Sequence, residues 1–586
     1  MVKKALLLLC VGLAIWIPRA FGLNRYVLTD EVVWLWRSAN FYYGLGQRDF
    51  TIASRNMSPG VVTMWANTAA FLVRFPEYRG YGQGLLDKYS LMESFLLEHD
   101  VNPHDLLTTG RALTAALNSG LLALACLLAY RLFGLLPALA GFLLIAFEPY
   151  YIGLTRLSHL DGPMSAFAIV ALLAFLVYLY DGQRLAPLLL SAAAAALSIL
   201  AKLPGLILLP TFALLWLWEA MRAGSAGRRQ PLLRPALLWA GAFLLTMLVF
   251  FPALWANPRI TISNLVVGPL RLAGNVFTLK PDRPADTARS NGAQTDDDNL
   301  DDKEIGPFEY ILRYPTRYIS HATPITLIGL LAGLLALLLS SGPFQSTLSR
   351  RAAIGVLVFV AVYTVLMTIP PKSSGKYYAP AYPSLDIIAG LGWAALAGWA
   401  QQGLRWLNTA GQAWAGRLSK AAAALILSAA VLIQALQALP EHPYYLTYLN
   451  PGFCSTQELC QQWSSGSGEG LDQAAAYLNG KPNAGQLKVM SLYGIGPFSY
   501  FFKGQTTPLI LSSSLSEAMQ LRKIDGMDYL VVYLNHWKRQ RPVLLFSHLN
   551  ELNLEPEQRI YLDGVEYARI YAVSQFPPGL FDTPSP

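Results

Sequence analysis

Residues 112–133 read ALTAALNSGLLALACLLAYRLF, an apolar run whose charged residue, Arg131, lies near its end. A helix of about 20 mostly apolar residues is long enough to cross the hydrocarbon core of a bilayer. The stretch therefore predicts a transmembrane helix, and about ten further runs repeat the pattern. They lie at residues 4–23, 137–151, 162–180, 186–201, 203–220, 236–253, 323–341, 352–370, 381–400 and 421–439, with 137–151 and 186–201 the short ones. We expect a mainly α, polytopic membrane protein with about 11 transmembrane helices.

The composition of the chain favours the same class. Hydrophobic residues make up 54% of the 586 residues, charged residues only 14%, and the mean hydropathy is +0.37, which exceeds what a soluble protein of this length usually shows. The N-terminus, with Lys3 and Lys4 before an apolar stretch, resembles a signal peptide. The flank from Arg19 to Tyr26 offers no small-residue cleavage site, so we expect a retained first helix.

The distribution of basic residues predicts the orientation, because Lys and Arg collect in the cytoplasmic loops of membrane proteins. An N-terminus on the cytoplasmic side of the cell membrane leaves 24–110, 254–321 and 440–586 outside. The net charge of +8 is then mostly a topology signal, and we expect no nucleic-acid partner. The basic residues that this orientation places inside are Arg131, Arg184, Arg222, Arg228, Arg229, Arg234, Arg350, Arg351, Arg405, Arg417 and Lys420.

The tail beyond Pro440 has a globular composition and no further run of membrane length. Residues 470–478 predict a helix, and the β-branched and aromatic stretches predict strands at 487–492, 529–533 and 567–573. We therefore divide the chain into a transmembrane domain, 1–439, and an extracytoplasmic α/β domain, 440–586.

The four cysteines fall into two groups. Cys454 and Cys460 are close in sequence, in a compartment that permits disulfides, so we expect a bridge between them. Cys10 and Cys126 lie in apolar segments, where we expect packing residues.

The polar stretch 281–304 contains an acidic run that resembles a calcium-binding loop. Counted from Asp297, position 6 is Asp302 where glycine is needed, and position 12 is Phe308 where glutamate is needed. A solvated loop is the favoured interpretation.

An acidic pair, Asp30-Glu31, follows the first helix and opens an amphipathic run. Thr29 as a helix cap, with both acids in the first turn, is sufficient to explain the pair. Helical spacing also places Arg37 and Trp34 on the face of Asp30, which favours a functional site. Both interpretations remain open at this point.

The short outer loop from Glu148 to Pro163 carries several ionisable groups. Asp161 has a simpler explanation as the N-cap of the next helix, with Pro163 in its first turn. Together with Glu148, Arg156 and His159, however, it indicates a candidate site.

Outward-facing lysines run against the topological bias and suggest an anionic partner such as a phosphate. Lys372, Lys376 and the adjacent Tyr377 lie in the loop 370–380, and Lys202 lies at the outer end of a helix break. Lysines that anchor helix ends at the membrane interface are the alternative explanation.

These motifs, in this order, resemble the GT-C glycosyltransferases that are related to protein O-mannosyltransferases and aminoarabinose transferases. The resemblance covers most of residues 20–385, and segments 442–451 and 468–472 resemble bacterial members of the group. The matching motifs are Asp30-Glu31, Ser58-Pro59-Gly60, Ser158-His159-Leu160-Asp161, Lys202-Leu203-Pro204-Gly205, Phe251-Pro252-Ala253-Leu254-Trp255, Thr323-Pro324 and Lys376-Tyr377-Tyr378.

The resemblance implies an inverting transfer of a sugar from a polyprenyl-phosphate donor to an acceptor hydroxyl. Carried over by position, Asp30 is the candidate base, with Glu31 beside it and Asp161 as the acid of the second loop, while Lys372 or Lys376 binds the donor phosphate. Two positions depart from the pattern, because Ser58-Pro59 replaces a common His-Pro and Gly162 replaces a second acid. The further candidate substrate-binding residues are Arg37, Arg156, His159, Lys202 and Tyr377.

No His, Cys and carboxylate pattern with metal-ligand spacing occurs in the sequence, so we expect no metal and no cofactor. Two other functions stay open: an oligosaccharide ligase that uses lipid-linked donors, and a transporter or lipid flippase. Transporters place ionisable residues at mid-membrane in broken helices and often repeat their halves. This chain keeps its charges at one face, which favours the transferase. The sugar, the acceptor and the lipid length are not predicted.

Overall fold

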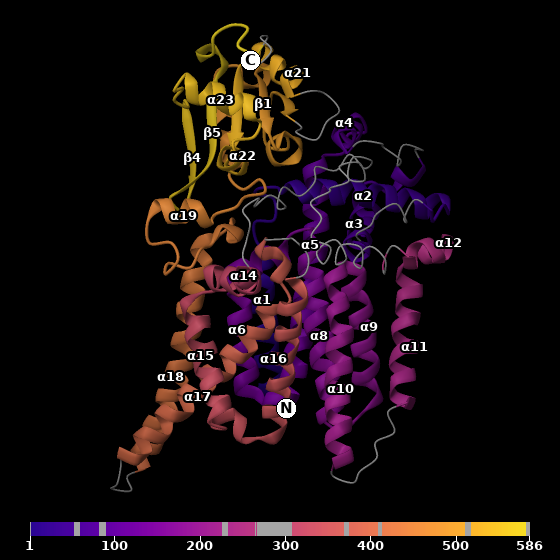
Figure 1. The fold of residues 1–586 in the computed structure, drawn as a ribbon, viewed down its shortest axis with the longest axis vertical. Helices are drawn as coiled ribbons and strands as arrows, with labels where there is room; N and C mark the ends of the chain where they lie inside the picture. Colours follow the sequence, from indigo (N-terminus) through magenta and orange to yellow (C-terminus); the bar gives the residue numbers. More distant parts are fainter. Residues whose placement is uncertain are drawn as a thin grey trace.

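The computed structural model describes residues 2–51, 59–80, 89–225, 233–263, 265, 307–368, 374–407, 413–509 and 517–581. Helices dominate residues 2–438, and a small sheet with short helices forms the tail (Figure 1). The helices of the first part are α1 Val2–Ala20, α2 Thr29–Gln47, α3 Val61–Arg74, α4 Ser90–Glu98, α5 Pro103–Phe133, α6 Leu135–Ala146, α7 Pro149–Arg156, α8 Asp161–Tyr180, α9 Leu185–Ala201, α10 Leu208–Ser225, α11 Leu233–Phe250, α12 Ala253–Ala256, α14 Pro307–His321, α15 Pro324–Leu338, α16 Thr347–Met367, α17 Ala381–Leu407 and α18 Ala413–Ala438.

Within the described residues, seven helices are long and apolar enough to cross a membrane, or eight if α6 and α7, bent by 71°, form one broken span. The apolar helices Leu6–Ala20 and Leu185–Ala201 are shorter. Each of the apolar runs in the sequence overlaps a helix, so the mainly α, multi-pass class is confirmed. The count of about 11 spans stays a prediction.

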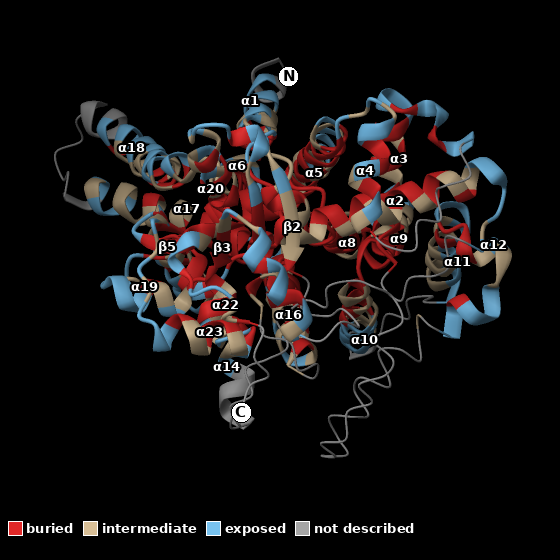
Figure 2. Ribbon diagram, turned by 90° about the horizontal axis from the view of Figure 1, so that it is seen from above, coloured by how far each residue is buried: buried red, intermediate tan, exposed pale blue. Residues whose placement is uncertain are grey.

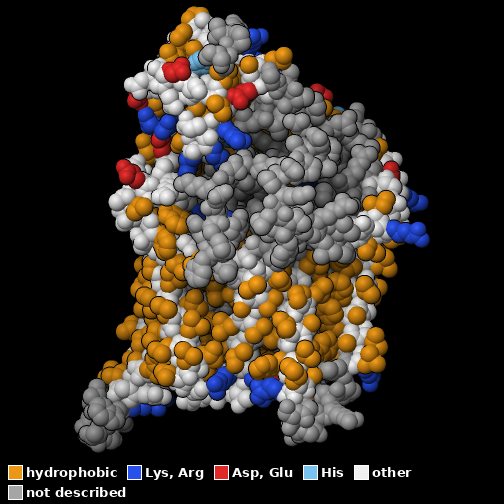
Figure 3. All heavy atoms as spheres, in the orientation of Figure 1, with side chains coloured by type: hydrophobic (Ala, Val, Ile, Leu, Met, Phe, Trp, Pro, Cys, Tyr) orange, Lys and Arg blue, Asp and Glu red, His pale blue; other side chains and the backbone are white. Residues whose placement is uncertain are grey.

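The bundle is built around α8, which is buried along nearly its whole length, whereas α1 and α18 expose one side (Figure 2). Glycines let neighbouring helices approach closely, as is common in membrane bundles. A Cβ on Gly392 of α17 would lie 1.9 Å from the carbonyl oxygen of Gly329 in α15. A Cβ on Gly390 would lie 2.2 Å from the backbone nitrogen of Gly141 in α6. Figure 3 shows a broad apolar band across the visible face of the bundle, with basic side chains at the end opposite the tail.

The tail folds as a five-stranded sheet of order β2-β1-β3-β5-β4. β1 pairs in parallel with β2 and β3, while β5 pairs antiparallel with β3 and β4. The predicted helix and the three predicted strands are present as α20, β1, β3 and β5, and β2 and β4 are additional. The elements are α19 Gln457–Trp463, α20 Leu471–Asn479, α21 Glu517–Leu521, α22 Leu534–Arg539, α23 Val543–Glu551, β1 Lys488–Leu492, β2 Gln505–Leu509, β3 Tyr529–Tyr533, β4 Gln558–Leu562 and β5 Val565–Ala572.

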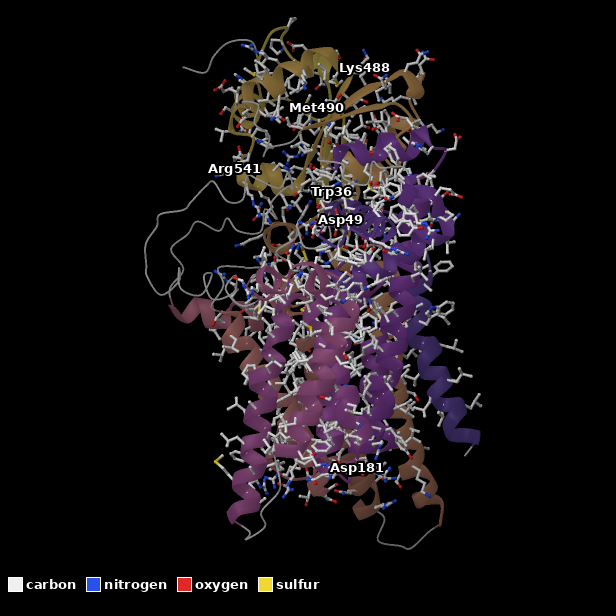
Figure 4. All side chains as sticks on the ribbon, turned by 90° about the vertical axis from the view of Figure 1, so that its right-hand side faces the viewer. Trp36, Asp49, Asp181, Lys488, Met490 and Arg541 are labelled. Carbon is white, nitrogen blue, oxygen red and sulfur yellow. A yellow bond between two sulfur atoms is a disulfide. The ribbon has the colours of Figure 1, made fainter. Side chains whose placement is uncertain are left out.

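The tail lies at one end of the bundle, where α2, α3, α4, α12 and α14 also gather (Figure 1). Figure 4 places Trp36 and Asp49 at the level between the helices and the sheet, and Asp181 at the opposite end of the bundle. The three segments expected on the outer side therefore have their described parts at the same end of the molecule.

The cysteines agree with the sequence except at one position. Cys454 and Cys460 form a disulfide with 4.6 Å between their Cα atoms, and Cys126 is buried. The expectation that Cys10 packs inside is wrong, because Cys10 lies on an exposed face of α1. The acidic stretch 281–304 lies outside the described residues.

Candidate functional site

Three segments that are far apart in the sequence meet at the carboxylate of Asp30. Asp30 lies in the first turn of α2, and its Oδ2 accepts hydrogen bonds from Lys376 Nζ and from His159 Nε2, each at 3.0 Å. Lys376 belongs to the short 3-10 helix Gly375–Tyr378, and His159 to the connection between α7 and α8. The fold thus brings the predicted base together with a predicted phosphate ligand across 346 positions of sequence.

His159 bridges two carboxylates. Its Nε2 faces Asp30, and its Nδ1 lies 2.9 Å from Oδ2 of Asp161. Burial alone would lower the pKa of His159, but the hydrogen bonds to Asp161 and Asp30 raise it to about 9. A protonated imidazole donates from both nitrogens. At neutral pH His159 is therefore a cation held between the two acids.

Asp161 faces a second lysine. Lys202 Nζ donates to both carboxylate oxygens of Asp161, at 2.8 and 3.0 Å, and lies 4.2 Å from the centre of the Tyr377 ring. Asp161 is fully buried and is the first residue of α8, where Leu160 takes the N-cap position instead. Lys202, Asp161, His159, Asp30 and Lys376 thus form a continuous chain of alternating charge.

Whereas its neighbour Asp30 lines a cavity, Glu31 lies in a buried ion pair with Arg111. Its buried carboxylate pairs with the Arg111 guanidinium, with Nε to Oε1 at 2.8 Å, and accepts from the N–H of Ser158 at 2.9 Å and of Leu28 at 3.0 Å. Burial alone would raise the pKa of Glu31, but the charge of Arg111 and these hydrogen bonds lower it. The cap expected from Thr29 is wrong, because Thr29 is already helical and the N-cap is Leu28.

The other predicted site residues occupy varied places. Arg37 stacks on Trp34, 4.5 Å from the ring centre, as the helical spacing suggests. The Arg156 guanidinium donates to the carbonyls of Phe21 and Pro443, which ties α7 to the start of the tail. Lys372 and Ser58 lie outside the described residues.

Two further predicted residues have internal partners. Glu148 accepts hydrogen bonds from Thr326 and Gln434, each at 2.9 Å, between α15 and α18. Tyr377 is buried, and its carbonyl accepts from the Tyr363 hydroxyl at 2.8 Å.

A cavity of about 50 Å³ opens beside Asp30. Asp30, His159 and Lys376 line it from the helical domain. The wall from the tail consists of Leu446, Ser465, Gly466, Ser467 and Glu469. The sequence feature that could have indicated this wall is the motif Gly468-Glu469-Gly470. The position of the wall opposite Asp30 follows only from the three-dimensional structure.

The site combines a carboxylate, two cations and a small polar cavity. A carboxylate at a cavity wall is suited to accept a proton, and lysine and protonated histidine are suited to stabilise an anion. Within the described part of the chain, no group of three or more His, Cys, Asp and Glu side chains is arranged to hold a metal ion.

No protein-family model matches the chain, and no curated protein matches it significantly. The structure is similar to that of ArnT from Cupriavidus metallidurans bound to undecaprenyl phosphate, with a TM-score of 0.45 and 13% identity over 98% of this chain and 99% of that one. It is also similar to the Archaeoglobus fulgidus oligosaccharyltransferase AglB in complex with an inhibitory peptide and a dolichol-phosphate, with a TM-score of 0.48 and 11% identity over 93% of this chain and 71% of that one.

Proposed function

We propose that the chain is an inverting glycosyltransferase that moves a sugar from a polyprenyl-phosphate donor to an acceptor hydroxyl at the outer face of the cell membrane. The observation that carries the proposal is the contact of Asp30 with Lys376 at 3.0 Å, in a cavity at the end of the bundle where the tail lies. Such a transfer needs a general base and, next to it, a cation that binds the phosphate.

In the proposed reaction, Asp30 removes the proton from the acceptor hydroxyl. The acceptor oxygen attacks the anomeric carbon from the face opposite the phosphate, so the configuration inverts. The bond from the anomeric carbon to the phosphate oxygen breaks, and its electron pair stays on the phosphate. Lys376 stabilises that charge, so the leaving group needs no acid.

Donor binding would also prepare the base. Without a phosphate, Lys376 stabilises the charged form of Asp30 through their ion pair. A bound phosphate competes for the Lys376 ammonium, so the Asp30 carboxylate becomes available to the acceptor hydroxyl. His159 remains between Asp30 and Asp161 and keeps the carboxylate in place.

The proposed function is tested directly with purified protein in detergent and a panel of undecaprenyl-phosphate sugars that covers neutral hexoses, pentoses and aminopentoses. With glycerol present as the acceptor, we expect one or a few donors to lose their sugar and release undecaprenyl phosphate, and the new glycosidic bond to have inverted configuration. Retention of configuration would contradict the mechanism, and loss of sugar from no donor would contradict the function.

Replacing Lys376 with alanine is expected to raise the KM for the donor and to slow transfer, because the ammonium meets the phosphate in both the ground state and the transition state. A charge-assisted hydrogen bond of this kind is worth about 10- to 100-fold in kcat/KM. Steady-state kinetics with the active donor measure the effect. Lys376→Arg should recover part of the activity, and Lys503→Ala, at an exposed site of the tail, is the matched control. An unchanged KM in Lys376→Ala would exclude Lys376 as a phosphate ligand.

The proposed orientation puts the tail and α2 outside and the connection between α8 and α9 inside. In a variant without Cys10 and Cys126, a membrane-impermeant maleimide on intact cells should label Asp49→Cys and Lys523→Cys but not Arg184→Cys. Permeabilised cells should label all three, which shows that each thiol is reactive. Labelling of Arg184→Cys alone in intact cells would invert the topology and place the site on the cytoplasmic side.

A further inference from the structure

Among the tail residues that line the cavity of Asp30, Glu469 is the one with an ionisable side chain. The residue is only 3% exposed, and its Oε2 accepts from the Ser467 N–H at 2.7 Å and from the Tyr533 hydroxyl at 3.1 Å. The hydrogen bonds from Ser467 and Tyr533 both go to Oε2, so neither of them uses Oε1. Glu469 lines the cavity that Asp30 and Lys376 also line.

The position of this carboxyl is fixed by close backbone packing. The Thr29 N–H, at the start of α2, donates to the carbonyl of Ser467 at 2.9 Å. Gly468 has φ +133°, and a Cβ there would lie 2.5 Å from the carbonyl oxygen of Val27. The segment that precedes Glu469 is therefore held against the helix that carries Asp30, so the two carboxyls keep a constant relation.

The charges around the cavity suit a phosphate at Lys376 and hydroxyl groups at Glu469. A phosphate is attracted to Lys376 and repelled by carboxylates, so the wall of Glu469 does not suit the donor phosphate. Burial raises the pKa of Glu469, while the charge of Lys376 acts in the opposite direction. Charged or neutral, the carboxyl keeps an oxygen that accepts a hydrogen bond, and hydroxyl groups are donors of matching size.

We propose that Glu469 is a positioning and specificity residue for the acceptor: its Oε1 binds a second hydroxyl next to the hydroxyl that Asp30 deprotonates. The preferred acceptor is then a vicinal polyol, as in a carbohydrate. This inference rests on the proposed function. The cavity of about 50 Å³ has room for the hydroxyl groups at one edge of such an acceptor and not for a whole sugar ring.

The experiment compares two small acceptors with the active donor: glycerol, which has a neighbouring hydroxyl, and 1-propanol, which has none. The wild type should transfer to glycerol with a kcat/KM about tenfold higher, as expected for one hydrogen bond to a buried carboxyl. Glu469→Ala should reduce this preference to about twofold or less, through a higher KM for glycerol, with transfer to 1-propanol nearly unchanged. Glu469→Gln retains an accepting oxygen and should keep part of the preference.

Retained transfer to 1-propanol in Glu469→Ala shows that the variant is folded and that Asp30 still works. The control is Glu557→Gln, which changes a carboxylate of the same domain that binds Tyr477 and Lys481 instead. An equal loss with both acceptors would assign Glu469 a purely structural role and overturn the inference, as would an unchanged preference. A wild type that transfers to neither acceptor, nor to water, from any donor would overturn the proposed function itself.

Discussion

Replacing Asp30 with asparagine is expected to lower the turnover number by about 10²- to 10⁴-fold, because the change removes the general base. Asparagine has nearly the size of aspartate, and its oxygen still accepts hydrogen bonds from Lys376 or His159. The helix start does not depend on Asp30, since Glu31 binds the Leu28 N–H. Donor affinity should therefore change little, and single-turnover kinetics with the active donor should show a slow chemical step.

The control for this prediction is Asp49→Asn, which changes a carboxylate just beyond the other end of α2 that binds Thr51. It should leave turnover within about twofold. Near-normal turnover in folded Asp30→Asn protein would indicate that the base is Glu31 or Asp161 and not Asp30. Either residue would first have to leave a buried ion pair, with Arg111 or with Lys202.

The sequence singled out the segments that the structure brings together at the candidate site, because composition and loop charge depend on local properties. Asp30, His159 and Lys376 follow from three outer loops, and each loop is recognised by polar residues between apolar runs. Their pairing could not be predicted, since Lys376 lies 346 residues from Asp30 and loop charge does not specify partners. For the same reason Arg111, which has an ordinary place near the start of a helix, was not expected to bind Glu31.

In the tail, the sequence did not predict the two edge strands of the sheet. β1, β3 and β5 lie inside the sheet, and β3 and β5 are rich in β-branched and aromatic residues, so their sequences predict strands, while β1 has Val489 as its one β-branched residue. β2 contains Pro508, which an edge strand tolerates because one side needs no ladder hydrogen bonds. β4 is the other edge strand, and the Asp563-Gly564 turn that joins it to β5, with φ +49° and +78°, was the available signal.

Replacing Glu31 with alanine is expected to destabilise the protein by about 3–5 kcal/mol, because it leaves the Arg111 charge buried without its partner. The same carboxylate also holds the Ser158 N–H at 2.9 Å, directly before His159, so its loss should loosen the connection that positions the histidine. The free energy of unfolding in detergent, followed by a tertiary signal, measures the change. Activity should fall through loss of folded protein and not through the chemical step of the folded fraction.

Two comparisons make this prediction specific to the buried pair. Glu555→Ala removes a carboxylate that is 77% exposed from its pair with Arg559, and it should cost about 1 kcal/mol or less. The double replacement Glu31→Leu and Arg111→Leu removes both charges, so it should be less destabilising than Glu31→Ala alone. If Glu31→Ala cost no more than Glu555→Ala, the pair would not hold α2 against α5. Glu31 would then return as a candidate for the base, since its carboxylate lies one position from Asp30 at the start of the same helix.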